Sequence, residues 1–477
     1  MKGALLAAGG VLTLSSRAAS PKRQRPNIVW ILAEDICPDL SCYGTKAVHT
    51  PNLDKLAAEG ARYTRAFCTS PVCSPSRSAM MTGMHQNAIG AHQHRTRPKR
   101  PLPEGVRPIT HYLREAGYFA AVNGKTDLNY QVENLADGKD YKPRKAGQPF
   151  FCQFTIGNTH RAWGRDRQRP IDPKDVEIPP YYPDTPLVRR DWANGLEEIQ
   201  IMDRRVAAIL KRLDDEGLRD NTVVFFIGDN GRCQVRGKQF LYDGGIHTPL
   251  IVRWPGRIKP GTVSGDLVST IDISAAILAI AGAGVPSHMH GRNFLDPATP
   301  KREYVFAARD KMDNTHDSMR CIRSKRYKYI LNLMPERAWC QYNRYKEASY
   351  PVLALLNVLN MEGKLPPAQA RFMAPRKPTE ELYDLSKDPH EVTNLASDPA
   401  CAKVLETMRA ELAAWRKRIG DRGVTEEFRK GGWPSKYPTR TLDEWRAHLK
   451  GWEDHLFRGK PAPGAKARRR ARKRKTP

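Results

Sequence analysis

The sequence lacks a long apolar run beyond its N-terminal segment, any Cys-x-x-Cys pair and any internal repeat. A membrane-spanning helix needs roughly 18 or more consecutive apolar residues, so no transmembrane segment is expected. The nine cysteines have no short repeated spacing, and their odd number in an exported protein suggests that at least one thiol is not in a disulfide. The 477 residues, 40% hydrophobic and 27% charged, exclude a mostly disordered chain and suggest two to three domains.

Acidic residues are absent from both ends of the chain. A basic start, an apolar stretch over 4–14 and small residues after it predict a signal peptide over residues 1–20, and hence a periplasmic or secreted protein. The alternative is a frayed N-terminus. The basic segment 457–477 is predicted to be a disordered tail that could hold the protein to polyanions or to a negatively charged surface. The formal net charge is +28, and residues 26–457 carry +13 of it, which suits an anionic ligand without identifying one.

Short apolar runs without alternation are typical of strands buried on both faces of a parallel sheet. Amphipathic stretches with helix start and stop signals lie between them. This alternation predicts an α/β sheet covered on both faces by helices. The expected strands are Arg25–Glu34, Phe150–Ile156, Thr222–Ile227 and Pro249–Trp254, and the expected helices are Thr50–Gly60, Ile109–Gly117 and Trp192–Gly217.

Polar residues gather where these strands end, which is where α/β sheets bind their ligands. They are Glu34, Asp35, His160, Asp229 and Asn230. After about residue 300 the pattern changes to short runs typical of antiparallel strands, followed by an amphipathic helix near Val404–Ile419. We therefore expect a main domain over residues 24–300 and a smaller α+β domain with an antiparallel sheet over residues 301–456.

The most informative segment runs from Cys73 to Gly83 and reads Cys-Ser-Pro-Ser-Arg-Ser-Ala-Met-Met-Thr-Gly. A cysteine at the start of a helix has a lowered pKa and raised reactivity. Taken alone, a small buried side chain at a turn explains Cys73 equally simply. The pattern Cys-x-Pro-Ser-Arg followed by Thr-Gly, however, resembles the signature of the type I sulfatases, the formylglycine-dependent members of the alkaline phosphatase superfamily.

Further blocks match this family in order along roughly residues 26–400. They are Pro26–Val29 with Glu34-Asp35, Cys42–Gly44, Thr50–Asp54, Gly124-Lys125, Gly228–Gly231, Gly237-Lys238 with Tyr242–Leu250, and Glu381–Leu385 with Asp388-Pro389. The resemblance implies an alkaline-phosphatase-like fold, in which a mixed, mostly parallel sheet is flanked by helices, with residues 24–300 as the catalytic domain.

The resemblance also implies that a separate maturation enzyme oxidises Cys73 to formylglycine (3-oxoalanine). The hydrated aldehyde offers one hydroxyl for attack on sulfur and a second one that later expels sulfate, which a serine could not do. By resemblance, the ligands of a divalent cation are Glu34, Asp35, Asp229 and Asn230. Hard oxygen ligands suit Ca²⁺, or alternatively Mg²⁺, better than Zn²⁺. At position 34 the family more often has aspartate.

Arg77, Lys125 and Lys238 would form a cationic wall around the sulfate oxygens, and His160 would contact sulfate or protonate the leaving oxygen. The family often reads Gly-Lys-x-His, whereas this chain has Asp127 where the histidine is expected. No catalytic role is therefore assigned to Asp127, which could contact a substrate amine or hydroxyl. The histidines His92, His94 and His247 are interpreted as structural or substrate-facing rather than as metal ligands.

Several blocks resemble heparan N-sulfatase-like and glycan-degrading bacterial sulfatases, so the expected reaction is hydrolysis of an O- or N-sulfate on a sulfated carbohydrate. Arg309, Asp310 and Asp313 are candidates for sugar contacts, with inter-domain salt bridges as the alternative. Two other functions stay open: a phosphonate monoester or phosphodiester hydrolase of the same superfamily, and a non-catalytic polyanion-binding protein. No nucleic-acid recognition motif is present in the body of the chain.

Overall fold

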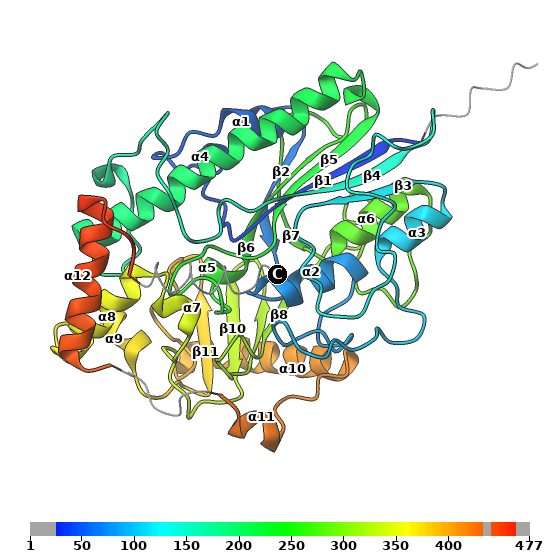
Figure 1. Cartoon of the computed structure of the whole chain (residues 1–477). Coiled ribbons are helices and arrows are strands. Elements are labelled where there is room, and N and C mark those ends of the chain that lie inside the picture. The colour runs from blue at the N-terminus through cyan, green and yellow to red at the C-terminus, as the bar shows by residue number, and fades with distance from the viewer. Residues whose placement is uncertain (1–24, 433–439, 464–477) are drawn as a thin grey trace, which may run out of the picture.

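Two β-sheets organise the protein (Figure 1). The computed structural model describes residues 25–432 and 440–463, so the predicted signal peptide and residues 464–477 of the predicted tail lie outside the described residues. The main sheet has seven strands, in the order β3 (Phe119–Asn123), β4 (Phe150–Ile156), β1 (Asn27–Ala33), β5 (Thr222–Gly228), β6 (His247–Arg253), β2 (Ala61–Phe67) and β7 (Thr262–Ser269).

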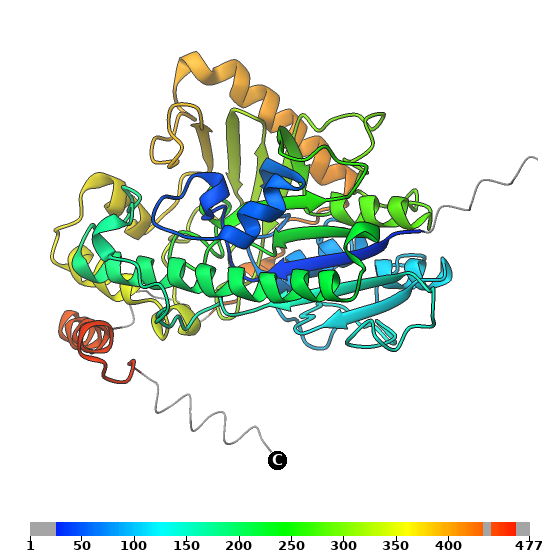
Figure 2. The same cartoon turned by 90° about the horizontal axis from the view of Figure 1, so that it is seen from above.

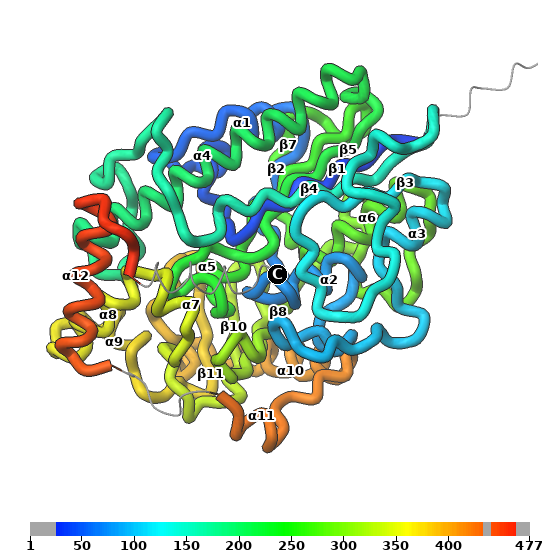
Figure 3. Tube along the Cα trace, in the orientation of Figure 1, coloured from blue at the N-terminus to red at the C-terminus, as the bar shows by residue number. Residues whose placement is uncertain are grey.

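Most neighbouring strands of this sheet are parallel, and β6 runs antiparallel to both β5 and β2. Strands β1 and β5 lie side by side at the centre although nearly two hundred residues separate them, as the tube in Figure 3 shows. The register pairs Ala33 with Gly228, so both strands end at the same edge. The expected strand Pro249–Trp254 is β6, which is antiparallel because it returns directly after β5 through a loop rather than a crossover helix.

Helices cover both faces of the main sheet, as the buried runs predicted. Side chains of β1 alternate between two hydrophobic clusters, with Val29 and Ile31 on one face and Ile28 and Trp30 on the other. Helices α1 (Pro51–Ala58) and α4 (Pro186–Asp215) pack on the first face, and α2 (Cys73–Thr82), α3 (Ile109–Glu115) and α6 (Asp272–Ala281) on the second. The sequence placed the start of α4 at Trp192, but the helix begins at Pro186 behind a Thr185 cap.

A four-stranded antiparallel sheet follows, in the order β11 (Glu380–Asp384), β10 (Tyr327–Asn332), β9 (Met319–Arg323) and β8 (Val305–Arg309). Helix α10 (Ala402–Arg418) packs on one of its faces through Leu412 and Trp415. The predicted fold class, a mostly parallel sheet flanked by helices with a smaller antiparallel sheet near the C-terminus, is confirmed. No helix of the described residues combines the length and apolar character that a membrane span requires.

Two helices of the 301–456 region lie away from the antiparallel sheet. Helices α8 (Pro351–Met361) and α12 (Leu442–Arg458) pack against each other and against α4, and Figure 2 shows α12 at the end of the molecule opposite α10. Trp445 and Trp452 of α12 are buried in the cluster that also contains α4. Residues 457 and 458, expected in the tail, continue α12. Four shorter helices are α5 (Asp243–Ile246), α7 (Arg344–Glu347), α9 (Pro367–Ala370) and α11 (Glu426–Lys430).

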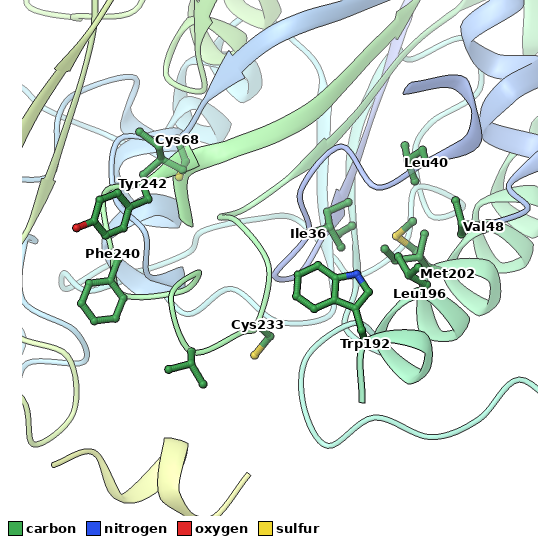
Figure 4. Packing of buried hydrophobic residues seen from close by; sticks show 14 of the residues in the cluster. Ile36, Leu40, Val48, Cys68, Trp192, Leu196, Met202, Cys233, Phe240 and Tyr242 are labelled. Atoms are coloured by element: carbon green, nitrogen blue, oxygen red, sulfur yellow. The ribbon is translucent and has the colours of Figure 1, made fainter. Parts of the chain in front are cut away.

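The loop that follows β1 is held against α4. Figure 4 shows Ile36 and Leu40 of this loop beside Trp192, Leu196 and Met202 of the helix. All of these side chains are buried. Because Ile36 directly follows the acidic pair at the end of β1, this packing fixes the position of that pair.

Candidate active site

The acidic residues at the ends of β1 and β5 meet at the edge of the main sheet. The backbone N–H of Asp229 donates to Ala33 O at 2.9 Å, and the backbone N–H of Asp35 donates to Asp229 Oδ1 at 2.9 Å. Asp35 has φ +52°, a left-handed conformation that costs free energy for a residue other than glycine. Both carboxylates are buried, so two distant stretches of sequence form one anionic centre.

Cys73 lies beside this centre as the first residue of α2. Its Sγ atom, one oxygen of Asp35 and one oxygen of Asp229 all lie within 4.8 Å of one another. The thiol donates to Asp35 Oδ1 at 3.6 Å, and Cys73 is only 1% exposed. The turn at the start of α2 therefore directs the side chain of Cys73 at the two carboxylates.

Three cationic side chains surround the centre. Lys238 Nζ lies 2.7 Å and 2.8 Å from the two oxygens of Asp35 and 3.0 Å from Cys73 Sγ. Arg77 Nε donates to Asp229 Oδ2 at 2.8 Å. The same guanidinium reaches Glu34 Oε1 at 3.4 Å, and Lys125 Nζ pairs with Glu34 Oε2 at 3.0 Å. The structure thus brings together all four residues predicted as metal ligands and the three predicted cations.

The electrostatics of this cluster follow from burial and pairing. Burial alone would raise the pKa of Asp35, but Lys238 and other nearby cations hold that pKa well below its usual range. Burial would lower the pKa of Lys238, and Asp35 keeps it raised, so the two stay charged together. Burial raises the pKa of Cys73. The unmodified thiol is therefore neutral at physiological pH and a poor nucleophile, contrary to the expectation from its helix-start position.

The oxygen-rich side of the centre fits a hard divalent cation. Asn230 Nδ2 donates to Asp35 Oδ1 at 2.8 Å, while Asn230 Oδ1 is buried without a hydrogen-bond partner among the described residues. An unpartnered buried amide oxygen is costly unless something binds it. With Asp35 and Asp229 it offers the oxygen ligands that Ca²⁺ and Mg²⁺ prefer. Glu34 is linked to Asp229 through Arg77, which pairs with both carboxylates.

His160 lies between Asp35 and Tyr345. Its Nε2 lies 3.8 Å from Asp35 Oδ2 and 3.4 Å from the hydroxyl of Tyr345. Its Nδ1 lies 2.6 Å from the carbonyl oxygen of Arg161. A carbonyl can only accept, so Nδ1 carries a hydrogen, and Nε2 is the ring nitrogen that remains for proton exchange with a substrate.

A cavity of about 480 Å³ opens beside this centre. His160 and Lys238 form its inner wall, and the other walls come from three segments that are distant in sequence. These segments contribute His94 and Arg95, then Met312, Asp313 and Asn314, then Arg344, Tyr345, Ala348 and Ser349. His94, interpreted as structural or substrate-facing, lines this cavity, and so does Asp313.

Asp127 does not contact Cys73 or the predicted metal ligands directly. Its two carboxylate oxygens accept from Arg95 Nε at 3.0 Å and Arg95 Nη2 at 2.9 Å, and one lies 3.5 Å from Lys125 Nζ. Both oxygens are therefore engaged by protein cations, which makes a direct contact with a substrate amine or hydroxyl less favourable. The partner, Arg95, belongs to no motif, and sequence reasoning missed it.

Arg309 and Asp310 lie outside the wall of the cavity. Arg309 pairs with Asp317 at 2.9 Å and is 1% exposed, and Asp310 pairs with Arg320 at 3.0 Å. Burial and pairing make a sugar contact less favourable for these two residues, and because both pairs lie within residues 301–456 they are not inter-domain salt bridges either. Tyr345 and Arg344 line the cavity but carried no sequence signal, because they follow a stretch without recognisable pattern.

Comparison with known proteins adds two family matches. The Sulfatase family model matches residues 26–135 and 129–283. A model described as the C-terminal region of N-sulphoglucosamine sulphohydrolase matches residues 231–351, which include Lys238 and most of the cavity wall.

Similar sequences and structures cover most of the chain. An ulvan-active sulfatase from Formosa agariphila is 35% identical, over 83% of this chain and 76% of its own length. Human N-sulphoglucosamine sulphohydrolase is 29% identical, over 84% of this chain and 91% of its own length. A putative sulfatase from Bacteroides fragilis has a TM-score of 0.65 at 21% identity, covering 87% of this chain and all of that one. The phosphonate monoester hydrolase of Agrobacterium radiobacter has a TM-score of 0.64 at 19% identity, covering 86% and 100%, which shows a shared fold.

Proposed function

Because this chain belongs to the sulfatase family and is a sulfuric ester hydrolase of its glycan-acting branch, we propose that it releases inorganic sulfate from a sulfated carbohydrate at the centre around Cys73. The observation that carries the proposal is the placement of Cys73 Sγ among Asp35, Asp229 and Lys238 in one buried cluster. Because burial keeps the thiol neutral, the nucleophile in the proposal is the formylglycine derived from Cys73, and a formylglycine-generating enzyme is the required partner.

The metal site of the proposal consists of Asp35, Asp229, Asn230 and Glu34. A divalent cation held there, Ca²⁺ or alternatively Mg²⁺, would polarise a sulfate oxygen and favour ionisation of the nucleophile. The oxygen of Asn230 that lacks a partner supports this ligand set. Asp35, which now pairs with Lys238, would share its two oxygens between the cation and that lysine.

The anionic sulfate group is bound by three cationic side chains, those of Lys238, Lys125 and Arg77. Lys238 Nζ is 3.0 Å from the sulfur that marks the position of the nucleophile, so it can donate to an oxygen of a sulfate attacked there. Arg77 is held on two sides, by Asp229 and by the carbonyl oxygen of Lys125, and this fixes the nucleophile side of the pocket. Preorganised donors of this kind stabilise the charge that develops in the transition state.

His160 is the proton donor of the proposal. Nδ1–H is held by the carbonyl of Arg161, so the proton that can be exchanged with substrate resides on Nε2. That atom borders the cavity and lies 3.8 Å from Asp35 Oδ2. His160 can therefore act as a general acid that protonates the leaving oxygen, so that the sugar leaves as an alcohol rather than as an alkoxide.

The substrate of the proposal is a sulfated glycan rather than a small aryl ester. The matched relatives are named for ulvan and for N-sulphoglucosamine, and the cavity beside His160 has the volume that a sugar unit requires. The apolar, lysine-led N-terminal segment supports export to the periplasm or the medium, where such polymers are met.

Mass spectrometry of the peptide that spans Cys73 tests the proposal directly. Protein from the native host, or protein coproduced with a formylglycine-generating enzyme, should give a peptide lighter by the difference between SH₂ and O. Cys68, buried five residues earlier, is the matched control and should remain cysteine. The matured protein should release sulfate from sulfated oligosaccharides, and the Cys73→Ala variant should not.

The same experiment separates the two alternatives. A plain thiol at Cys73 together with retained binding of sulfated polymers would support a non-catalytic polyanion-binding protein and overturn the proposal. The phosphonate hydrolase relative shares the fold, so turnover of aryl sulfate, aryl phosphate and aryl phosphonate should be compared on the matured protein. Faster turnover of the phosphorus esters would assign the chain to that activity instead.

A further inference from the structure

Arg95 is fixed at the rim of the cavity by a two-point ion pair. Both carboxylate oxygens of Asp127 accept from its guanidinium, through Nε and Nη2. This pairing leaves the Nη1 group of Arg95 free of a hydrogen bond or ion pair within the described chain, and the side chain is 52% exposed. A guanidinium clamped on one edge keeps a planar set of N–H donors for a second anion.

Several residues around this rim have a left-handed backbone conformation, which is strained for residues other than glycine. Of the seven residues other than glycine with positive φ among the described residues, five belong to or adjoin this site. They are Asp35, Arg95, Asp127, Gln239 and Asp313. Left-handed backbone at such positions persists only where the surrounding structure enforces it, and it gathers at ligand-binding sites.

Arg95 is also tied to the turn that carries Cys73. Its backbone N–H donates to Ser74 Oγ at 3.3 Å, and the neighbouring His94 N–H donates to the carbonyl of Lys311 at 3.0 Å. The guanidinium therefore keeps a constant position relative to the nucleophile. A group bound by Arg95 would be held at a set distance from the sulfur under attack.

Arg344 supplies a second cation to the same cavity. It begins α7, is exposed, and makes no ion pair with a carboxylate of residues 25–432 or 440–463. Asp313 is the acidic residue of the lining, and it pairs with His94 at 3.0 Å. The cavity thus presents two guanidinium groups beyond the sulfate-binding lysine.

We propose that Arg95 and Arg344 bind a second anionic group of the glycan, a carboxylate or a further sulfate, on the sugar unit that carries the scissile sulfate or on the unit next to it. This inference rests on the proposed function and specifies its substrate class. Asp127 acts in it as a positioning residue, because it touches Arg95 and not the substrate. Its pKa is lowered to about 2, since Arg95 and Lys125 outweigh the effect of its burial, so the clamp stays charged at every working pH.

The test compares three matched substrates with the same scissile sulfate. One is a sulfated disaccharide that contains a uronic acid, the second is its carboxyl-reduced counterpart, and the third is the reduced compound with an additional sulfate. The parent enzyme should have a higher kcat/KM for the first or the third than for the second, which is called neutral because the scissile sulfate is its only charged group. Whichever of the two gains more identifies the anion. The preference should shrink as salt is added, since the rim is exposed to solvent.

The variants Arg95→Ala and Arg344→Ala test whether these two arginines cause the preference for a substrate with a second anionic group. Each should reduce the ratio of kcat/KM for the anionic over the neutral substrate by about 10- to 100-fold, as expected for loss of hydrogen bonds to a charged group. Asp127→Asn should reduce the same ratio by a smaller factor, because Arg95 remains but is no longer clamped. Arg107→Ala is the matched control, since Arg107 forms a comparable two-point ion pair with Glu115 on the exposed surface, and its ratio should equal that of the parent.

Two results would overturn the inference while leaving the proposed function intact. One is a parent enzyme that desulfates all three substrates equally well. The other is an equal loss on anionic and neutral substrates in both arginine variants. Should Arg95→Ala fail to fold, as judged by circular dichroism, Arg344→Ala and the salt dependence of the parent decide the question. Absence of sulfate release from every sulfated substrate by protein with formylglycine at position 73 would instead overturn the proposed function.

Discussion

At the scale of single residues, Lys346 is a buried lysine that pairs with no acid in the described chain. Its Nζ donates to the carbonyl oxygens of Val235 and Lys238, each at 2.9 Å, and it lies over the ring of Phe240. It therefore anchors α7, which forms a wall of the cavity, to the loop that presents Lys238. Burial, together with the charges of Arg309 and Lys238, lowers the pKa of Lys346 to about 7 from 10.5.

This lowered pKa predicts a specific pH dependence of stability. Between about pH 7 and 10.5 the unfolded chain binds a proton at position 346 that the folded chain does not, so the free energy of unfolding rises with pH. The contribution is at most about 1.4 kcal/mol per pH unit. Denaturant unfolding at a series of pH values should give the free energies of unfolding of the parent and of Lys346→Met. The difference between these two free energies should change with this slope between about pH 7 and 10.5.

Lys328→Met is the matched control for this prediction. Lys328 is equally buried, but Asp243 and Glu391 hold its pKa above the usual value, so its proton is kept in both states across most of the same window. The difference in free energy of unfolding between the parent and Lys328→Met should not rise with pH. A pH-independent difference for Lys346→Met would show that Lys346 keeps its charge inside the protein.

Some site residues could be predicted from the sequence because each follows a recognisable strand. Asp35 and Asp229 come directly after the apolar runs of β1 and β5, and parallel neighbours end at one edge. Arg95 and Tyr345 could not be found this way. Arg95 reaches the cavity on a loop and Tyr345 on the one-turn helix α7. The position of each segment depends on tertiary contacts of the whole fold, and neither segment is long enough to show a periodicity that local reasoning can use.

At the scale of elements, the loop between β5 and β6 is packed so closely that it requires glycine. A Cβ atom on Gly245 would lie 2.0 Å from Phe240 O and 2.5 Å from Gly237 O, both backbone atoms that cannot move aside cheaply. This loop carries Asn230 at its start and Lys238 in its middle. The close approach of Gly245 therefore holds the segment that presents Lys238.

We predict that Gly245→Ala lowers the free energy of unfolding by about 1–3 kcal/mol and reduces kcat, because the loop must shift and take Lys238 with it. Thermal melting and steady-state kinetics on a sulfated substrate check both effects. Gly244→Ala is the control, since a Cβ there has its first contact at an ordinary 3.6 Å. If the two variants behaved alike, the close packing of this loop would not be what positions Lys238.

Other elements escaped sequence prediction for physical reasons. Strand β2 reads Ala-Arg-Tyr-Thr-Arg-Ala-Phe, which has too many charges for a run buried in a sheet. Arg62 stacks over Tyr43 and Arg65 donates to the carbonyl of Gly265, so the fold supplies partners that the strand's own sequence does not announce. By contrast, β4 was predicted to the residue because it is a mostly apolar run in which most side chains are buried.

At the scale of the whole molecule, the candidate active site gathers several buried charged side chains, which the surrounding elements must pair with one another. Asp35, Asp229 and Glu34 are held by Lys238, Arg77 and Lys125, and these pairs join β1, β5, α2 and two loops. The unpartnered oxygen of Asn230 shows that the arrangement still has ligand capacity to offer. A cation bound there would connect both central strands of the main sheet.

A ligand that binds only the folded state stabilises it, by about 2.7 kcal/mol at a hundred times its dissociation constant. We therefore expect Ca²⁺ or Mg²⁺, added to protein stripped with a chelator, to raise Tm in a concentration-dependent way that differential scanning fluorimetry can follow. Asp229→Asn should abolish the rise, because it replaces a charged ligand without changing the volume. Asp243→Asn removes a partly buried carboxylate that is paired with Arg323 and Lys328 away from the centre, so it should lower Tm yet keep the rise. A melting temperature indifferent to both ions would mean that Lys238 and Arg77 already satisfy the carboxylates, and that the centre holds no cation.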